Sequence, residues 1–207
     1  PLEEIKKVTK DGLEKGFQIC THAIGDRANK EVLDIYESIL KNKNVDHRFR
    51  IEHAQHIDLK DIPRFNKLGI IAASQGIHLS SDRPWAIKRL GEKRIVDSAY
   101  PWRKLIDAGT IIVNGTDAPV EPLSPIASFY ASVARKTLEG YPEMGYEPEE
   151  KMTRMEALQS YTINAAFSAF EEDIKGSIDI GKFADFTVLA QDIIEVEEDE
   201  ILNTKIE

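Results

Sequence analysis

The chain has 207 residues, of which 42% are hydrophobic and 30% are charged, and its formal net charge is −9. This content predicts one large domain or one domain with a small appendage, and the acidic balance excludes a general nucleic-acid binder, which needs a basic surface. The single cysteine, Cys20, excludes an intrachain disulfide and fits a reducing compartment. No apolar run approaches the ~20 residues that span a bilayer, so we expect a cytoplasmic protein without a membrane partner.

Residues 1–170 alternate helical and strand patterns. An N-terminal helix is indicated by the spacing of Leu2, Ile5, Val8 and Leu13. Four short apolar segments predict strands: 17–22, 49–54, 70–75 and 110–117. Helical patterns follow them, at 26–40, at 58–69, within 76–109, and near 124–138 and 153–169. Strands that alternate with helices imply an α/β fold with parallel pairing and right-handed crossovers.

The tail, residues 171–207, has a different pattern, and we place a domain boundary near residue 171. Apolar and polar residues alternate over 175–193, and Gly176 and Gly181 interrupt the pattern. This predicts a β-hairpin or a pair of short strands.

Three polar side chains stand at predicted strand ends. His22 ends the first strand, His53 ends the second and Asp117 ends the fourth. In parallel α/β folds, the loops at the carboxyl ends of the strands meet on one face and carry the chemistry. Histidine nitrogen and carboxylate oxygen both suit a divalent metal such as zinc. Taken singly, each histidine could instead be a hydrogen-bonded structural residue, and Asp117 could cap the following turn.

Other residues near the strand ends give weaker signals. His78, after the third strand, and Trp85, in the long segment 76–109, could contact a substrate, although tryptophan more often seals helices. Glu52 should be structural, because adjacent strand residues face opposite sides and it could share a site with His53 only if the strand broke there. Cys20 lies two positions from His22, and we expect it to pack rather than to act as a nucleophile.

These motifs carry a resemblance to a known family. THAIGDRA (21–28), RIEHAQ (50–55), ASQGIHLSSD (73–82) and NGTDAPV (114–120) resemble, in that order, the second half of the barrel in the amidohydrolase superfamily. The similarity is to the amidohydrolase 3 group of metal-dependent hydrolases, some of which are labelled exoenzyme regulatory protein. The tail GSIDIGKFADFTVLAQD (176–192) resembles the strands with which those enzymes return to a small β-sandwich domain.

The resemblance implies a function and a set of roles. His22 and His53 would match the family's metal-binding histidines on the fifth and sixth strands. Asp117 would match the eighth-strand aspartate, which contacts the metal and takes a proton from the attacking water. A divalent ion, zinc by preference, lowers the pKa of its water to about 7 and polarises the scissile carbonyl. The implied reaction is hydrolysis of an amide, a cyclic amide or a related C–N bond.

The resemblance also implies missing parts. The family barrel has eight strands, and only its strands 5–8 match here, without the first-strand histidines and the fourth-strand lysine. We therefore expect residues 1–170 to be the C-terminal half of a TIM-like (β/α)8 barrel and residues 171–207 to belong to the sandwich domain. Four units alone would leave open edges. The expected partners are the N-terminal half of the same protein, a small amide-type substrate and a second copy of the chain.

Two other functions remain open at this point. A regulatory or binding protein could retain the fold without the chemistry, and it would bind no metal. A phosphate-binding α/β enzyme is disfavoured, because the sequence holds neither GxGxxG nor GxxxxGK[ST]. One or two metal ions would be expected in a complete enzyme, and the 207 residues alone could be inactive and could hold none.

Overall fold

The computed structural model describes residues 1–41 and 44–207. The chain divides into two compact units. Unit 1 comprises Pro1–Ser74 and Glu92–Ile112, and unit 2 comprises Gln75–Gly91 and Val113–Glu207. No helix in the described part of the chain has the length and apolar character that crossing a membrane requires.

The described strands form one sheet in the order β1-β2-β3-β4, and its first three strands lie within unit 1. The strands are β1 (Cys20–Ala23), β2 (Arg50–His53), β3 (Ile71–Ser74) and β4 (Ile112–Asn114). β1 pairs with β2 and β2 pairs with β3, both in parallel. The predicted α/β alternation and parallel pairing are confirmed, with shorter strands than the sequence suggested. That these strands are half of a closed barrel stays a prediction.

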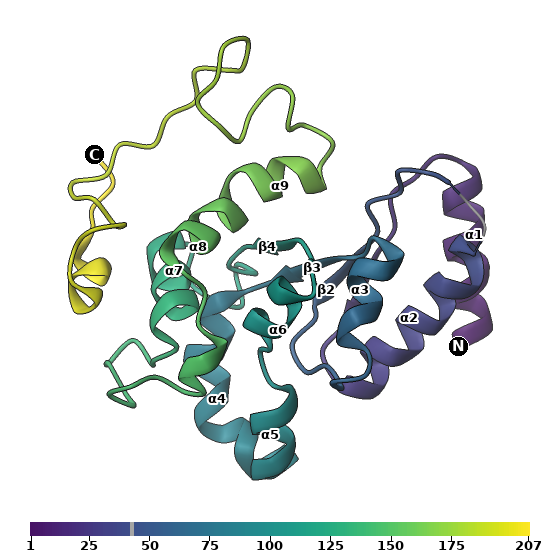
Figure 1. The fold of residues 1–207 in the computed structure, drawn as a ribbon, viewed down its shortest axis with the longest axis horizontal. Helices are drawn as coiled ribbons and strands as arrows, with labels where there is room; N and C mark the ends of the chain where they lie inside the picture. Colours follow the sequence, from purple (N-terminus) through teal and green to yellow (C-terminus); the bar gives the residue numbers. More distant parts are fainter. Residues whose placement is uncertain (42–43) are drawn as a thin grey trace. The chain divides into compact units, whose positions relative to one another are not determined.

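Five described helices belong to unit 1. They are α1 (Leu2–Glu14), α2 (Asp26–Leu40), α3 (Ile62–Leu68), α5 (Glu92–Ser98) and α6 (Trp102–Asp107). The apolar stripe predicted for α2 is confirmed, since Val32, Leu33, Tyr36, Ile39 and Leu40 are all buried. Figure 1 shows α2 next to both α1 and α3, which are its packing neighbours. The stop predicted at Gly69 is also confirmed, because α3 ends there in a left-handed turn with φ 66°.

The first helix differs from its expected role. Leu2, Ile5 and Val8 form the apolar spacing that predicted this helix, yet all three side chains are exposed. Thr9 is instead the buried residue of α1. The predicted helix is therefore confirmed, whereas its apolar stripe does not face the core of unit 1.

Unit 2 contains the remaining described helices. They are α4 (Gly76–Leu90), α7 (Pro125–Ala134), α8 (Arg154–Tyr161), α9 (Ile163–Ser168) and the 3-10 helices η1 (Pro148–Glu150) and η2 (Glu198–Asn203). α7 packs against α4, α8 and η2. The helix expected over 153–169 is split at Thr162, whose φ of −118° and ψ of −96° lie outside the helical region.

The tail departs from the expected strand pair. Residues 175–193 contain no regular strand, and Leu189 makes an isolated antiparallel bridge with Ile206. Figure 1 draws this segment as loops between α9 and the short yellow helix η2. Ile178 and Ile180 are 87% and 102% exposed, so the apolar alternation that predicted strands finds no partner strand within the described chain. The tail belongs to unit 2, and a separate domain beginning at residue 171 stays a prediction.

Candidate functional site

The two histidines predicted as metal ligands lie side by side in unit 1. His22 is near the end of β1 and His53 is the last residue of β2. Their ring centroids are 4.6 Å apart, with an angle of 75° between the ring planes. His22 is exposed and His53 is partly exposed. Unit 1 thus presents two neighbouring imidazoles at the carboxyl ends of two parallel strands.

A break in β2 explains how His53 reaches His22. The strand register pairs His22 with Glu52, and it pairs Ala23 with His53. A regular strand would turn His53 to the face opposite Glu52. His53 instead has φ 75° and Ala54 has φ 45°, both in the left-handed region that ends the strand. The sequence-based condition for His53 to join the Glu52 face, a break in the strand, is met.

The backbone at His53 is strained, and neighbouring contacts hold it. A non-glycine residue at positive φ costs on the order of 1–3 kcal/mol and is found most often at functional sites. The next residues are fixed by Gln55, whose carbonyl accepts from Tyr100 N–H at 2.7 Å. The Gln55 Nε2 amide also donates to the Tyr100 hydroxyl at 2.7 Å. This reciprocal pair anchors the loop directly after His53.

Glu52 and Cys20 lie on the same strands and have structural surroundings. Arg50 Nε donates to Glu52 Oε1 at 2.8 Å, which agrees with a structural role for Glu52. Cys20 is an exposed residue, contrary to the expectation that it packs. Partial burial of its sulfur nevertheless raises the pKa of the Cys20 thiol, with the Arg50 charge opposing that effect. A thiol with a raised pKa is protonated near neutral pH, which disfavours a nucleophilic role.

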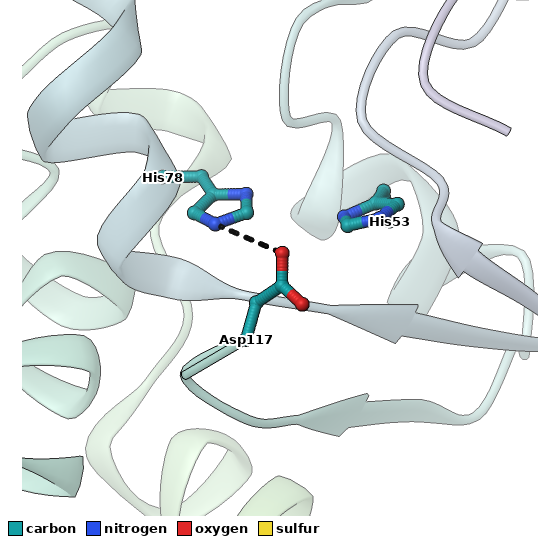
Figure 2. Close-up of side chains that lie close together, drawn as sticks. All are labelled: His53, His78 and Asp117. Atoms are coloured by element: carbon teal, nitrogen blue, oxygen red, sulfur yellow. Dashed lines mark ion pairs between the residues drawn. The ribbon is translucent and has the colours of Figure 1, made fainter. Parts of the chain in front are cut away.

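The second pair of candidate residues lies in unit 2. His78 is in the first turn of α4 and is 7% exposed, whereas Asp117 follows β4 and is exposed. Figure 2 marks the ion pair between His78 Nε2 and Asp117 Oδ2, which are 3.7 Å apart. Asp117 also has a left-handed backbone, with φ 58°. The turn after it closes through its backbone oxygen, which accepts from Val120 N–H at 2.8 Å, so the carboxylate is not needed as a cap.

A buried polar network sets the spacing of this second pair. Asn114, the last residue of β4, accepts from Gly76 N–H through Oδ1 at 2.8 Å. Its Nδ2 amide donates to the hydroxyls of Ser132 and Ser160, at 3.3 Å and 3.1 Å. Asn114 therefore ties the strand that leads to Asp117 to the first residue of the helix that carries His78.

Trp85, the remaining predicted contact residue, is 50% exposed in the middle of α4. Within unit 1 the structure brings His22 and His53 together, and within unit 2 it brings His78 and Asp117 together. Sequence reasoning did not foresee the second pairing, nor the parts played by Asn114 and by Asn29, a buried residue of α2. One signal was available for Asn29: it occupies the apolar stripe of α2, where a polar residue must find buried partners.

Comparison with known proteins identifies relatives over most of the chain. "Protein LONG AFTER FAR-RED 3" of Arabidopsis thaliana is 36% identical over 91% of this chain and 32% of its own length. The "Putative amidohydrolase YtcJ" of Bacillus subtilis is 35% identical over 92% of this chain and 35% of its own length. The "N-substituted formamide deformylase" of Arthrobacter pascens is 32% identical over 93% of this chain and 36% of its own length. The chain thus spans about a third of the length of these relatives.

Solved structures lead to the same group of proteins. An uncharacterized metal-dependent hydrolase from Pyrococcus horikoshii has a TM-score of 0.81 and 27% identity, covering 95% of this chain and 38% of its own. A second one, from Pyrococcus furiosus, has a TM-score of 0.74 and 30% identity, covering 88% of this chain and 35% of its own. The amidohydrolase family, finally, matches residues 1–207. The chain therefore belongs to the amidohydrolase family.

Proposed function

We propose that the protein is a metal-dependent hydrolase of non-peptide C–N bonds, in amides or cyclic amides. His22, His53 and Asp117 would hold a divalent ion, with zinc as the first candidate. Membership of the amidohydrolase family supports the general class. The deformylase relative is named for an N-substituted formamide, which supports a small, non-peptide amide as the substrate class.

The observation that carries the proposal is the histidine pair of unit 1. Two imidazoles with centroids 4.6 Å apart are close enough to share one ion, because zinc binds each ligand nitrogen at about 2.0–2.1 Å. His53 reaches this position through a left-handed backbone, a conformation that recurs at functional sites. Imidazole nitrogens with one carboxylate form a donor set that fits zinc and related ions.

The chain's own residues would supply the remaining chemistry. When bound, a divalent ion polarises the scissile carbonyl and makes the attacking water more acidic. Asp117 would accept a proton from that water and return it to the leaving nitrogen as the C–N bond breaks. His78 lies against the same carboxylate and can orient it, or donate from its ring to the substrate carbonyl. Exposed Trp85 offers an apolar surface for the substrate.

The competing function is a binding or regulatory protein that retains the fold without the reaction. Because this chain spans about a third of its relatives, the activity is proposed for a protein of the relatives' length. We expect the 207 residues alone to bind the metal more readily than they turn over a substrate.

Elemental analysis tests the metal part of the proposal. The chain is equilibrated with zinc and desalted beside the variants His22→Ala and His47→Ala. His47 is a matched control because it belongs to the same unit and its ring bonds backbone groups, Leu68 O and Phe49 N–H. We expect about one zinc per chain in the wild type and in His47→Ala, and almost none in His22→Ala. Equal zinc in all three proteins would contradict the assigned ligands. Zinc in none of them would move the same assay to a protein of the relatives' length, where the absence of zinc would favour the non-catalytic function.

A further inference from the structure

Asn29 is a polar residue at the start of the apolar stripe of α2. It lies in the second turn of α2, on the stripe that continues with Leu33, Tyr36 and Leu40, and its exposure is 0%. A buried amide without partners would be destabilising, so its hydrogen bonds must be accounted for.

The Asn29 amide nitrogen faces backbone carbonyls alone. Nδ2 lies within hydrogen-bond distance of four carbonyl oxygens that share its two hydrogens, those of Ala23 at 3.1 Å, Ile24 at 3.2 Å, Gly25 at 3.0 Å and His56 at 3.1 Å. The Oδ1 atom is buried and has no hydrogen-bond partner among the described residues. The opposite orientation of the amide would place Oδ1 against four carbonyl oxygens. This position thus requires a hydrogen-bond donor. The side-chain nitrogen of Asn29 makes these hydrogen bonds and its side-chain oxygen makes none.

These carbonyls belong to the two loops that follow the candidate ligands. Ala23–Gly25 come directly after His22, and His56 comes three residues after His53. A backbone bond from His56 N–H to Ile24 O, at 2.9 Å, joins the same two loops. Asn29 therefore connects the end of β1 to the end of β2 on the side where both histidine rings lie.

We propose that Asn29 is a positioning residue that fixes the distance between the rings of His22 and His53. The inference deepens the proposed function, because it concerns the same two ligands. It does not depend on a metal, however, since the hydrogen bonds from Asn29 and the ring contact both lie within unit 1. Removing the amide frees the two loops, and a looser loop moves the rings apart.

The first test measures the distance between the rings directly. Nuclear Overhauser contacts between the ring protons of His22 and His53 are recorded in the wild type, Asn29→Ala and Tyr36→Phe. Tyr36 is the matched control: it is buried in the same helix, and its hydroxyl donates to Thr21 Oγ1 at 2.7 Å and to Arg50 O at 3.1 Å, nearer the start of the strands. We expect the contact to persist in Tyr36→Phe and to fall below about half its intensity in Asn29→Ala, since a displacement of ~1 Å is enough.

Zinc affinity, measured by competition with a chelator on the same three proteins, gives the second reading. We expect Asn29→Ala to weaken binding about 10- to 100-fold, as removal of a partner that orients a ligand does, and Tyr36→Phe to change it less than about threefold. A lost ring contact in Asn29→Ala, in a chain whose wild type binds no zinc, would leave this inference standing and would count only against metal binding by the 207-residue chain.

Poor folding of Asn29→Ala would not remove the test. Asn29→Ser keeps one donor, and we expect it to be folded and to lie between wild type and Asn29→Ala in both measurements. Ring contacts and zinc affinity that stay at wild-type values in a folded Asn29 variant would overturn the inference. Equal losses in Asn29 variants and Tyr36→Phe would also overturn it, because they would reveal a general loss of stability.

Discussion

Two asparagines hold the two candidate pairs, and they do so with opposite chemistry. In unit 1, Asn29 only donates, and its acceptors are backbone carbonyls. In unit 2, Asn114 accepts from Gly76 N–H and donates to the hydroxyls of Ser132 and Ser160. A carbonyl can only accept, whereas a hydroxyl can reverse its role. The first site therefore requires a hydrogen-bond donor, and the second can adapt to a side chain that accepts or donates.

The two units also differ in how deeply their ion pairs are buried. In unit 1, the side chains of Arg50 and Glu52 are 26% and 29% exposed. In unit 2, those of Arg83 and Glu147 are 8% and 7% exposed, with Nη2 and Oε1 2.6 Å apart. Arg83 is on the helix that carries His78, so this buried pair fastens α4 to the segment before α8. Water screens the first pair and not the second.

The largest expected effect compares these ion pairs. Glu147→Gln should lower the free energy of unfolding by about 3–5 kcal/mol, because it leaves the Arg83 guanidinium buried without its counter-charge. Glu52→Gln should cost about 1 kcal/mol or less, because Arg50 is partly solvated. Urea unfolding followed by circular dichroism measures both. Similar losses would mean that burial does not distinguish the two pairs.

The next comparison exchanges each asparagine for its isosteric acid. Asn29→Asp should cost about 3 kcal/mol at pH 7, because a buried carboxylate would face four carbonyl oxygens. Asn114→Asp should cost about 1 kcal/mol, because one oxygen still accepts from Gly76 N–H and the serine hydroxyls can turn to donate.

The pH dependence sharpens this comparison. Burial beside carbonyl oxygens would raise the pKa of the introduced carboxyl in folded Asn29→Asp above its unfolded value. The folded state then binds the proton more tightly, so the deficit in stability grows as pH rises above the unfolded pKa and shrinks as pH falls. Urea midpoints at several pH values should therefore converge toward the wild type in acid for Asn29→Asp. A loss of stability that does not change with pH would contradict the placement of residue 29 against four carbonyl oxygens.

The smallest expected effect concerns the glycines at the starts of the two helices. A Cβ at Gly76 would collide with Ser132 Oγ and with the Ser128 backbone oxygen, so Gly76→Ala should cost about 2 kcal/mol. A Cβ at Gly25, which precedes α2, would meet nothing within 4 Å. Gly25→Ala should therefore cost about 1 kcal/mol or less, from the poorer N-cap. Thermal unfolding curves of the two variants decide whether α4 starts in the tighter space.

Much of the fold was accessible from the sequence. Apolar periodicity predicted the four strands and the buried stripe of α2, and Gly69 marked the end of α3. The expected strand pair in the tail failed, because a strand forms only with a partner and alternation at Ile178 and Ile180 does not supply one. The apolar stripe of α1 is exposed for a related reason: periodicity shows which residues share one face of a helix and not which element covers that face.

The candidate site was predictable in its residue types and not in its pairings. Strand ends located His22, His53 and Asp117, because chemistry gathers there in parallel sheets. The meeting of His22 with His53 depends on a left-handed residue, which strand alternation does not predict. The pairing of His78 with Asp117 depends on tertiary bonds to Asn114, which come from residues far apart in the sequence.

The left-handed backbone at His53 also limits how this position can evolve. Histidine, asparagine and aspartate are the non-glycine residues that adopt positive φ most readily, and β-branched residues avoid it. Exchange of His53 for Asp therefore carries little conformational cost, whereas Val or Ile is disfavoured by the backbone. His22 lies in a regular strand, and its backbone does not restrict substitution in this way. Libraries designed to test the two proposed metal ligands should accordingly be narrow at residue 53 and broad at residue 22.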